Sequence, residues 1–207
     1  KNGKRSRQKR EQKRGGSMAK FKIPEVLTPE EQEKFLKAFN KKAKTGLRNY
    51  AMVRLMLDAG LRCGEVLNLK TNDVDFNTGK IHIKQGKGSK DRIVWLNEEA
   101  LEVLRKWREI KPESELLFTT LQGGAIEPRY VRAMVKRKAK QAGINKDIHP
   151  HTLRHSFATD LYRESKNLRL VQKALGHSSI STTEIYTHII DEELEKEMKF
   201  FRSKEVA

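Results

Sequence analysis

The sequence predicts a mainly α-helical domain that carries a small three-stranded antiparallel sheet. Two patterns lead to this prediction. Apolar residues recur at helical spacing over most of the chain, and between about residues 74 and 96 they alternate with polar residues. A chain of 207 residues with 36% hydrophobic content can form one domain of ordinary size around a buried core.

The first helix is expected to begin at Pro29. Thr28 is a suitable N-cap, Pro29 suits the first helical position, and Glu31 completes a capping box. A second helix is expected over about 47–58 and a short helical segment over about 65–69, because apolar residues are dense there. The same reasoning predicts helices at about 98–110, 128–142, 151–165, 168–175, 181–188 and 191–203.

The sheet is expected to have three strands, each marked by a pair of alternating apolar residues: Val74 and Phe76, Ile81 and Ile83, and Ile93 and Trp95. Asn77-Thr78-Gly79 predicts the first turn, and the basic loop 86–91 predicts a hairpin between the last two strands.

The charge balance favours a polyanionic partner such as double-stranded DNA. The net charge is +17, and lysine or arginine side chains that neutralise phosphates release condensed counterions. Residues 1–20 are interpreted as a basic disordered tail or an engineered extension; in the second case residues 1–17 precede a true start at Met18. Residues 1–17 hold a net +7, so the other 190 residues keep +10 and the inference of a nucleic-acid partner stands.

A cytoplasmic location is expected. No apolar run approaches the ~20 residues that a membrane helix needs, and no secretion signal is recognisable at the amino end. The single cysteine, Cys63, excludes an internal disulfide and fits a reducing compartment.

Six residues could assemble around one phosphodiester: Arg62, Lys87, His151, Arg154, His177 and Tyr186. A tyrosine hydroxyl has a pKa of about 10 and is a poor nucleophile at neutral pH. A metal-free site that attacks DNA with it needs positive charge at the phosphoryl oxygens, a base near the phenol and an acid near the leaving oxygen. The set therefore predicts DNA cleavage and rejoining through a covalent tyrosyl intermediate.

Each residue suits one role in this chemistry. Arg62 and Arg154 can grip two phosphate oxygens, because a guanidinium fork matches them better than an ammonium does. His177 is a donor to a phosphoryl oxygen. His151, one helical turn before Arg154, is the expected general base. Lys87, at the tip of a hairpin, is the expected general acid, and Tyr186, on a late helix, is the expected nucleophile.

The motifs around these residues resemble the catalytic domain of the tyrosine recombinase (phage integrase) family, most closely its Xer-like and integrase members. The matching segments are 61–69, 86–88, 151–159, 175–177 and 186–188. The resemblance implies a 3′-phosphotyrosyl link at Tyr186, a free 5′-hydroxyl, no need for ATP or a metal, and a carboxylate, Glu65, that supports Arg62. It also implies that residues 21–207 form the catalytic domain.

The resemblance further implies contacts between copies of the chain. In this family the helix after the tyrosine docks onto a neighbouring protomer, so residues 191–203 are expected to join protomers on DNA, in a tetrameric synapse. Packing of that helix on its own domain is the alternative. Family members usually carry a second, helical DNA-binding domain, whereas only the basic tail precedes Phe21, so weak DNA affinity is expected.

Other interpretations stay open. A type IB topoisomerase shares the chemistry, and a DNA-binding regulator without activity is a further alternative. His151 and His155 are spaced as in a zinc pair, which His149 and Cys63 could complete, but no glutamate lies between the pair.

Several neighbouring residues have more ordinary interpretations. His155 is interpreted as a packing or supporting residue, and Cys63 as a small filler beside Arg62. The two tryptophans, Trp95 and Trp107, are expected in the core or covering the sheet. Three cations could either track phosphates or lie on a solvated face: Lys84, Lys90 and Arg92.

Overall fold

The structure, a computed structural model, describes residues 24–84, 91–177, 179–180 and 182–187. Its named helices are α2 (Pro29–Lys37), α3 (Lys44–Asp58), α4 (Cys63–Asn68), α5 (Glu98–Ile110), α6 (Pro128–Gln141), α7 (Pro150–Ser165) and α8 (Leu168–Leu175), with a 3-10 turn, η1, at Thr71–Asp73. Residues 182–187 are also helical. Strands β1 (Lys80–Ile83) and β2 (Arg92–Trp95) pair antiparallel. The expected mainly α architecture is confirmed.

Helix α2 begins where the sequence predicts. The Thr28 hydroxyl accepts a hydrogen bond from the backbone N–H of Glu31, and the Glu31 carboxylate accepts one from the N–H of Thr28. Pro29 occupies the first helical turn, where its missing N–H costs no hydrogen bond.

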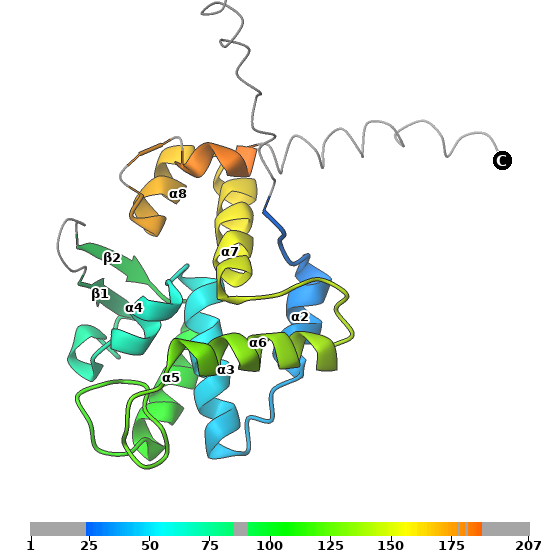
Figure 1. The fold of residues 1–207 in the computed structure, drawn as a ribbon. Coiled ribbons are helices and arrows are strands. Elements are labelled where there is room, and N and C mark those ends of the chain that lie inside the picture. Colours follow the sequence, from blue (N-terminus) through cyan, green and yellow to red (C-terminus); the bar gives the residue numbers. More distant parts are fainter. Residues whose placement is uncertain (1–23, 85–90, 178, 181, 188–207) are drawn as a thin grey trace, which may run out of the picture.

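Helix α3 is the centre of the fold. Residues 48–57 are all buried, because α3 packs against both α5 and α7 and also contacts α4. In Figure 1, α7 stands beside α3, with α8 at one end of α7 and the hairpin next to α8. A second, smaller apolar cluster lies between α7, α8 and the helical segment 182–187, and consists of Ala158, Val171, Leu175 and Tyr186.

The prediction of a third strand at Val74 and Phe76 is wrong for the residues that the structure describes. Val74 forms a single bridge with Ile81, and no ladder continues from it. The reason is the tight turn that follows: the Asp75 side chain accepts hydrogen bonds from residues 77 and 78, so the chain reverses before a strand can extend. Val74 and Phe76 are buried, so the alternation indicated burial without a strand.

The two faces of β2 are the reverse of what its hydrophobicity suggests. Arg92 and Val94 are buried, whereas Ile93 is exposed and the Trp95 residue is 62% exposed. Trp95 is therefore outside the core, and the interpretation of Arg92 as a solvated or phosphate-tracking residue is wrong. Trp107 is fully buried, as predicted, and its indole N–H donates to the backbone oxygen of Leu117.

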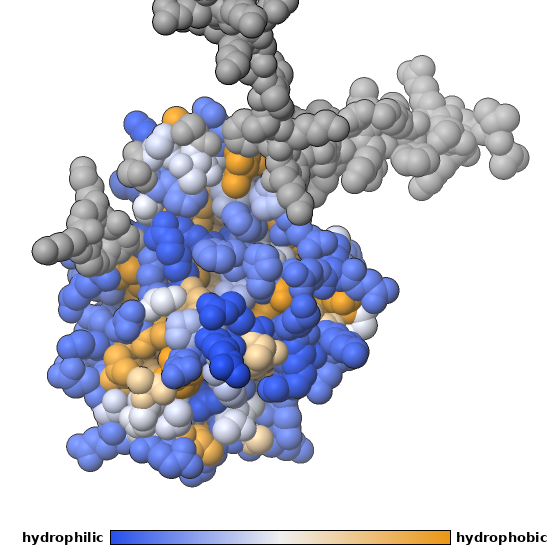
Figure 2. Space-filling model, viewed as in Figure 1, coloured by the Kyte–Doolittle hydropathy of each residue, from blue (hydrophilic) through white to orange (hydrophobic). Residues whose placement is uncertain are grey.

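Some predictions lie outside the described residues: the basic tail 1–20, Lys87 and Lys90 in the hairpin loop, and the helix 191–203. Over the part of the chain that is described, no helix is both long and apolar enough to cross a lipid bilayer. The face drawn in Figure 2 is mainly hydrophilic, with apolar residues in separate patches.

Candidate active site

Arg62 is placed by the start of α4. It is the N-cap residue, and the Glu65 carboxylate one turn later accepts hydrogen bonds from the Arg62 backbone N–H at 2.7 Å and from its guanidinium at 2.9 Å. The Arg62 side chain is 37% exposed, so part of it remains accessible to solvent or a ligand. The contact with Glu65 that the resemblance implied is present.

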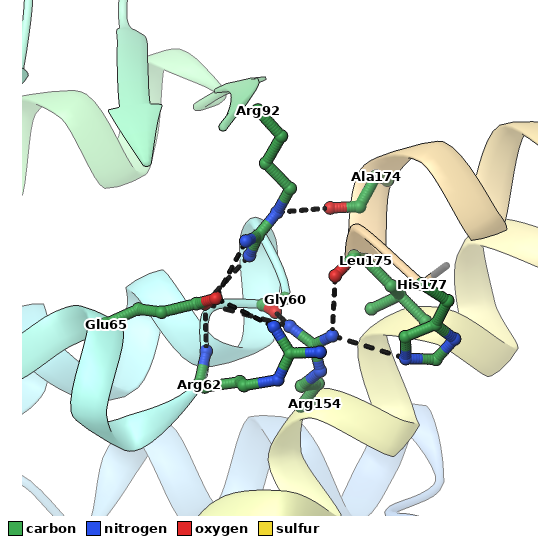
Figure 3. Close-up of polar contacts among 8 residues, drawn as sticks. All are labelled: Gly60, Arg62, Glu65, Arg92, Arg154, Ala174, Leu175 and His177. Atoms are coloured by element: carbon green, nitrogen blue, oxygen red, sulfur yellow. Dashed lines mark hydrogen bonds and ion pairs between the residues drawn. The ribbon is translucent and has the colours of Figure 1, made fainter. Parts of the chain in front are cut away.

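Glu65 is the centre of a cluster of three arginines, drawn in Figure 3. Arg92 donates to both Glu65 oxygens, at 2.7 and 2.8 Å, and Arg154 lies 3.8 Å from one of them. Burial alone would raise the pKa of the Glu65 carboxyl, but hydrogen bonds from Arg92 and the neighbouring positive charges hold it below its ordinary value. One carboxylate therefore orients Arg62 and Arg92 by hydrogen bonds and lies at ion-pair distance from Arg154.

Arg154 comes from the first half of α7 and is held by main-chain oxygens. Its guanidinium donates to the carbonyls of Gly60 and, at 2.7 Å, Leu175, and one nitrogen lies 3.4 Å from Nε2 of His177. Burial and the charge of Arg62 lower the pKa of Arg154 to about 10, so it remains charged at neutral pH.

His177 follows the end of α8. Gly176 adopts a left-handed conformation there, which ends the helix and turns the chain toward α7. Nδ1 of His177 lies 3.1 Å from the hydroxyl of Thr183, which fixes the ring while Nε2 faces Arg154. Burial and the charges of Arg154 and Arg62 lower the pKa of His177 to about 4, so the ring is neutral.

Tyr186 is buried, with 1% of the residue exposed, and its hydroxyl lies 2.9 Å from Nδ1 of His155 on α7. Burial raises the pKa of Tyr186 to about 12, although Arg154 and Arg62 act in the opposite direction. Burial also lowers the pKa of His155 to about 4. Because the ring is neutral and the phenol protonated, the phenol is the stronger donor and Nδ1 the acceptor.

His151 lies on the exposed side of α7, one turn before Arg154. Burial of its ring and the positive charges of His149, Arg154 and Arg62 lower the pKa of His151. The hydrogen-bond partner of the phenol in this structure is His155, which sequence reasoning treated as a packing or supporting residue. The assignment of His151 as base stays a prediction.

Four of the six predicted site residues are brought to one end of α7: Arg62, His151, Arg154 and His177. Tyr186 reaches the same helix through His155. Two residues were missed, Arg92 and His155. The sequence offered one signal for each. Arg92 lies on a short amphipathic strand and His155 lies next to Arg154, and either side chain needs a polar partner if it is buried.

Two further expectations concern Cys63 and the histidines in and next to α7, namely His149, His151 and His155. Cys63 packs partly buried against the main core, and burial raises the pKa of its thiol, which agrees with its interpretation as a filler. Within the described ranges, no group of three or more His, Cys, Asp or Glu side chains is arranged to hold a metal ion.

The arrangement suits an oxyanion. Arg62 presents a partly exposed side chain near the buried charge of Arg154, and a ring nitrogen of His177 lies 3.4 Å from Arg154. Charge-assisted hydrogen bonds from guanidinium groups to phosphate oxygens are strong and geometrically specific.

The family model described as "Phage integrase family" matches residues 25–193. The chain belongs to the phage integrase family. Among curated members of this family, it is 40% identical over 173 residues to a tyrosine recombinase of Thermosipho africanus, covering 83% of this chain and 60% of the relative. It is 38% identical over 180 residues to the tyrosine recombinase XerD of Ralstonia nicotianae, covering 84% and 58% respectively.

Solved members of the phage integrase family share the fold. The crystal structure of XerA recombinase superposes with a TM-score of 0.76 at 34% identity, covering 87% of this chain and 66% of the other. XerH bound to palindromic difH, in a post-cleavage complex, gives 0.75 at 37% identity, covering 87% and 54%. The chain thus spans about 60% of the length of the first curated relatives it matches.

Proposed function

We propose that this chain carries the catalytic domain of a site-specific DNA recombinase, which cleaves and rejoins DNA through a 3′-phosphotyrosyl intermediate. The observation that carries the proposal is the cluster of Arg62, Arg154 and His177. Tyr186 is held next to this cluster by its hydrogen bond to His155, the neighbour of Arg154 on α7. Residues 21–207 form this domain in the proposal. Its task in the cell is integration, excision or the resolution of DNA dimers.

Arg62, Arg154 and His177 stabilise the negative charge that grows on the phosphoryl oxygens in the transition state. Preorganised donors suit this task because they need little rearrangement when the charge develops. Arg154 is held by two backbone carbonyls, and His177 by Thr183, so both groups are already oriented. Arg62, with the most exposed side chain of the three arginines, meets the phosphate first.

Tyr186 attacks the phosphorus after it leaves the pocket beside His155. In the pocket, a pKa of about 12 makes the phenol less nucleophilic than a free tyrosine. In the proposal, it moves toward the exposed side of α7, where His151 is the general base. Burial and nearby positive charges lower the pKa of His151, which favours the neutral ring that can accept a proton. Lys87 is the proposed general acid for the leaving 5′-oxygen.

Double-stranded DNA is the proposed partner. Helix α6 supports this partner independently of the cluster, because it carries basic residues and no acidic ones: Arg129, Arg132, Lys136, Arg137, Lys138 and Lys140. The relative XerH was solved on a DNA substrate. Residues 191–203 are proposed to join copies of the chain on DNA, in a tetrameric synapse, and neither ATP nor a metal ion is required.

The test is formation of a covalent adduct. The full chain is incubated in EDTA with a pool of nicked duplexes of randomised sequence, in which cleavage near the nick releases a short fragment and traps the intermediate. An adduct is expected that Tyr186→Phe abolishes. Tyr162→Phe, the same change at a tyrosine of α7, should leave the adduct in place.

The other outcomes identify other functions. Metal-dependent cleavage without an adduct indicates a nuclease, and relaxation of supercoiled plasmid without site preference indicates a topoisomerase. DNA binding with no cleavage at all indicates a regulator. Each of these results refutes the proposed function.

A further inference from the structure

The inward orientation of Arg92 is the starting point. Strand β2 exposes Ile93 and Trp95 and buries Arg92 on its opposite face, where 6% of the Arg92 side chain is exposed. Exposing apolar side chains while burying a charge is unfavourable unless the charge is fully paired. The strand is therefore organised around what Arg92 contacts.

Arg92 makes three hydrogen bonds with two different elements. Its two terminal nitrogens donate to the two oxygens of Glu65 on α4, at 2.7 and 2.8 Å, and its Nε donates to the backbone oxygen of Ala174 at 2.9 Å. Ala174 lies in the last turn of α8, where helix carbonyls have no partner within the helix. Arg92 thus links the hairpin, α4 and the end of α8.

These contacts lead to both ends of the phosphate-binding cluster. Glu65 is also the carboxylate that orients Arg62. Arg92 and Arg154 hold successive carbonyls, those of Ala174 and Leu175, immediately before the turn that places His177 (Figure 3). Moving Arg92 would remove its hydrogen bonds to both oxygens of Glu65. It would also leave the end of α8 held by Arg154 without Arg92.

We propose that Arg92 is a positioning residue for the recombination site: it orients Arg62 through Glu65 and His177 through the end of α8, without contacting DNA itself. This inference rests on the proposed function. A lysine cannot replace Arg92 fully, because one ammonium cannot donate in the plane of both Glu65 oxygens and to a third acceptor as the guanidinium fork does.

The first experiment does not require DNA cleavage. Inorganic phosphate is titrated into the folded protein while the ring protons of His177 are followed by NMR, in wild type and in Arg92→Gln, Arg92→Lys and Arg105→Gln. Arg105 is a matched control on α5, since it also joins a carboxylate, that of Glu98, to a backbone carbonyl, that of Phe76. Circular dichroism checks that each variant is folded.

Arg92→Gln is expected to weaken phosphate binding severalfold and to shift the His177 signals, while Arg105→Gln leaves both as in wild type. Arg92→Lys separates positioning from charge. Partial loss with lysine supports positioning, whereas wild-type phosphate affinity with lysine means that only the charge matters and overturns the proposal. If Arg92→Gln does not fold, the lysine variant decides the matter alone.

The second experiment is a double-mutant cycle on the rate of adduct formation, with Arg92→Gln, Glu65→Gln and both together. Arg92→Gln is expected to slow adduct formation by about 10- to 100-fold, the loss typical when a reacting group is misplaced by about 1 Å. Because one of the two routes by which Arg92 acts runs through Glu65, the loss in the double variant should be clearly smaller than the sum of the two single losses. Additive losses overturn the proposal.

The two proposals fail in different ways. If the wild-type chain forms no adduct on any duplex, the recombinase function fails, while the phosphate titration still tests the role of Arg92. If wild type forms an adduct and Arg92→Gln matches Arg105→Gln in rate and phosphate affinity, the role of Arg92 fails alone.

Discussion

The contact between the partly buried His155 and the buried Tyr186 makes the fold sensitive to acid in a way that can be measured. Burial lowers the pKa of His155 from its ordinary value of 6.5 to about 4. The unfolded chain therefore takes up a proton on this ring near pH 6.5, whereas the folded chain takes it up only near pH 4. The stability that this ring contributes is complete above pH 6.5 and is lost progressively as the pH falls to 4.

The size of the effect follows from the same values. A pKa that falls from 6.5 to about 4 corresponds to at most about 3.4 kcal/mol of folding free energy. His155 is only partly buried, so solvent screening reduces the expected contribution to about 1–2 kcal/mol. His177 adds a loss of the same sign, because its pKa is also lowered to about 4.

The assay is urea unfolding of wild type, His155→Gln and His82→Gln at several values between about pH 7 and pH 4. Glutamine keeps a hydrogen-bonding side chain beside Tyr186 but does not titrate. The free energy of unfolding of His155→Gln should fall with acid by about 1–2 kcal/mol less than that of wild type. His82 is exposed on β1, and its replacement should leave the wild-type profile unchanged. Identical profiles for wild type and His155→Gln would refute the reasoning.

Three further predictions concern the backbone, the phenol and the core. Gly60→Ala should cost about 1–3 kcal/mol in urea unfolding, because φ is +63° there and a Cβ would lie 2.4 Å from the Phe157 ring; an unchanged midpoint contradicts this. Tyr186 has its pKa raised to about 12, so its stabilising contribution is complete below pH 10 and is lost as the pH rises from 10 to 12, by about 2–3 kcal/mol. Urea unfolding across that range should show a smaller loss for Tyr186→Phe, and parallel curves would argue against it. Trp107→Ala should lower the free energy of unfolding by about 3–5 kcal/mol, whereas Trp95→Ala should change it by less than about 0.5 kcal/mol; equal losses would contradict the burial difference.

Local chemistry predicted the parts of the fold that depend on neighbours in sequence. The start of α2 follows from Thr28, Pro29 and Glu31, because a capping box involves residues three positions apart. The motif residues Arg62, Arg154 and His177 were predicted as a set, and the structure brings them together.

The parts that sequence reasoning missed depend on partners far along the chain. Arg92 is buried because Glu65, 27 residues earlier, pairs with it, and no pattern within a four-residue strand reveals that partner. His155 meets Tyr186, 31 residues later, only after α7 and the segment 182–187 have packed. The third strand failed for a local reason, since the Asp75 turn competes with strand extension.

The carbonyls that hold Arg154 have a consequence for how the site tolerates sequence change. Gly60 and Leu175 contribute peptide oxygens, which every amino acid possesses, so replacing a neighbouring side chain cannot delete these acceptors. Only changes that displace the main chain, such as an insertion ahead of α4 or a proline near the end of α8, can remove them. Random mutagenesis of the surroundings should therefore disable this arginine mostly through shifts of the backbone and seldom through single losses of side-chain polarity.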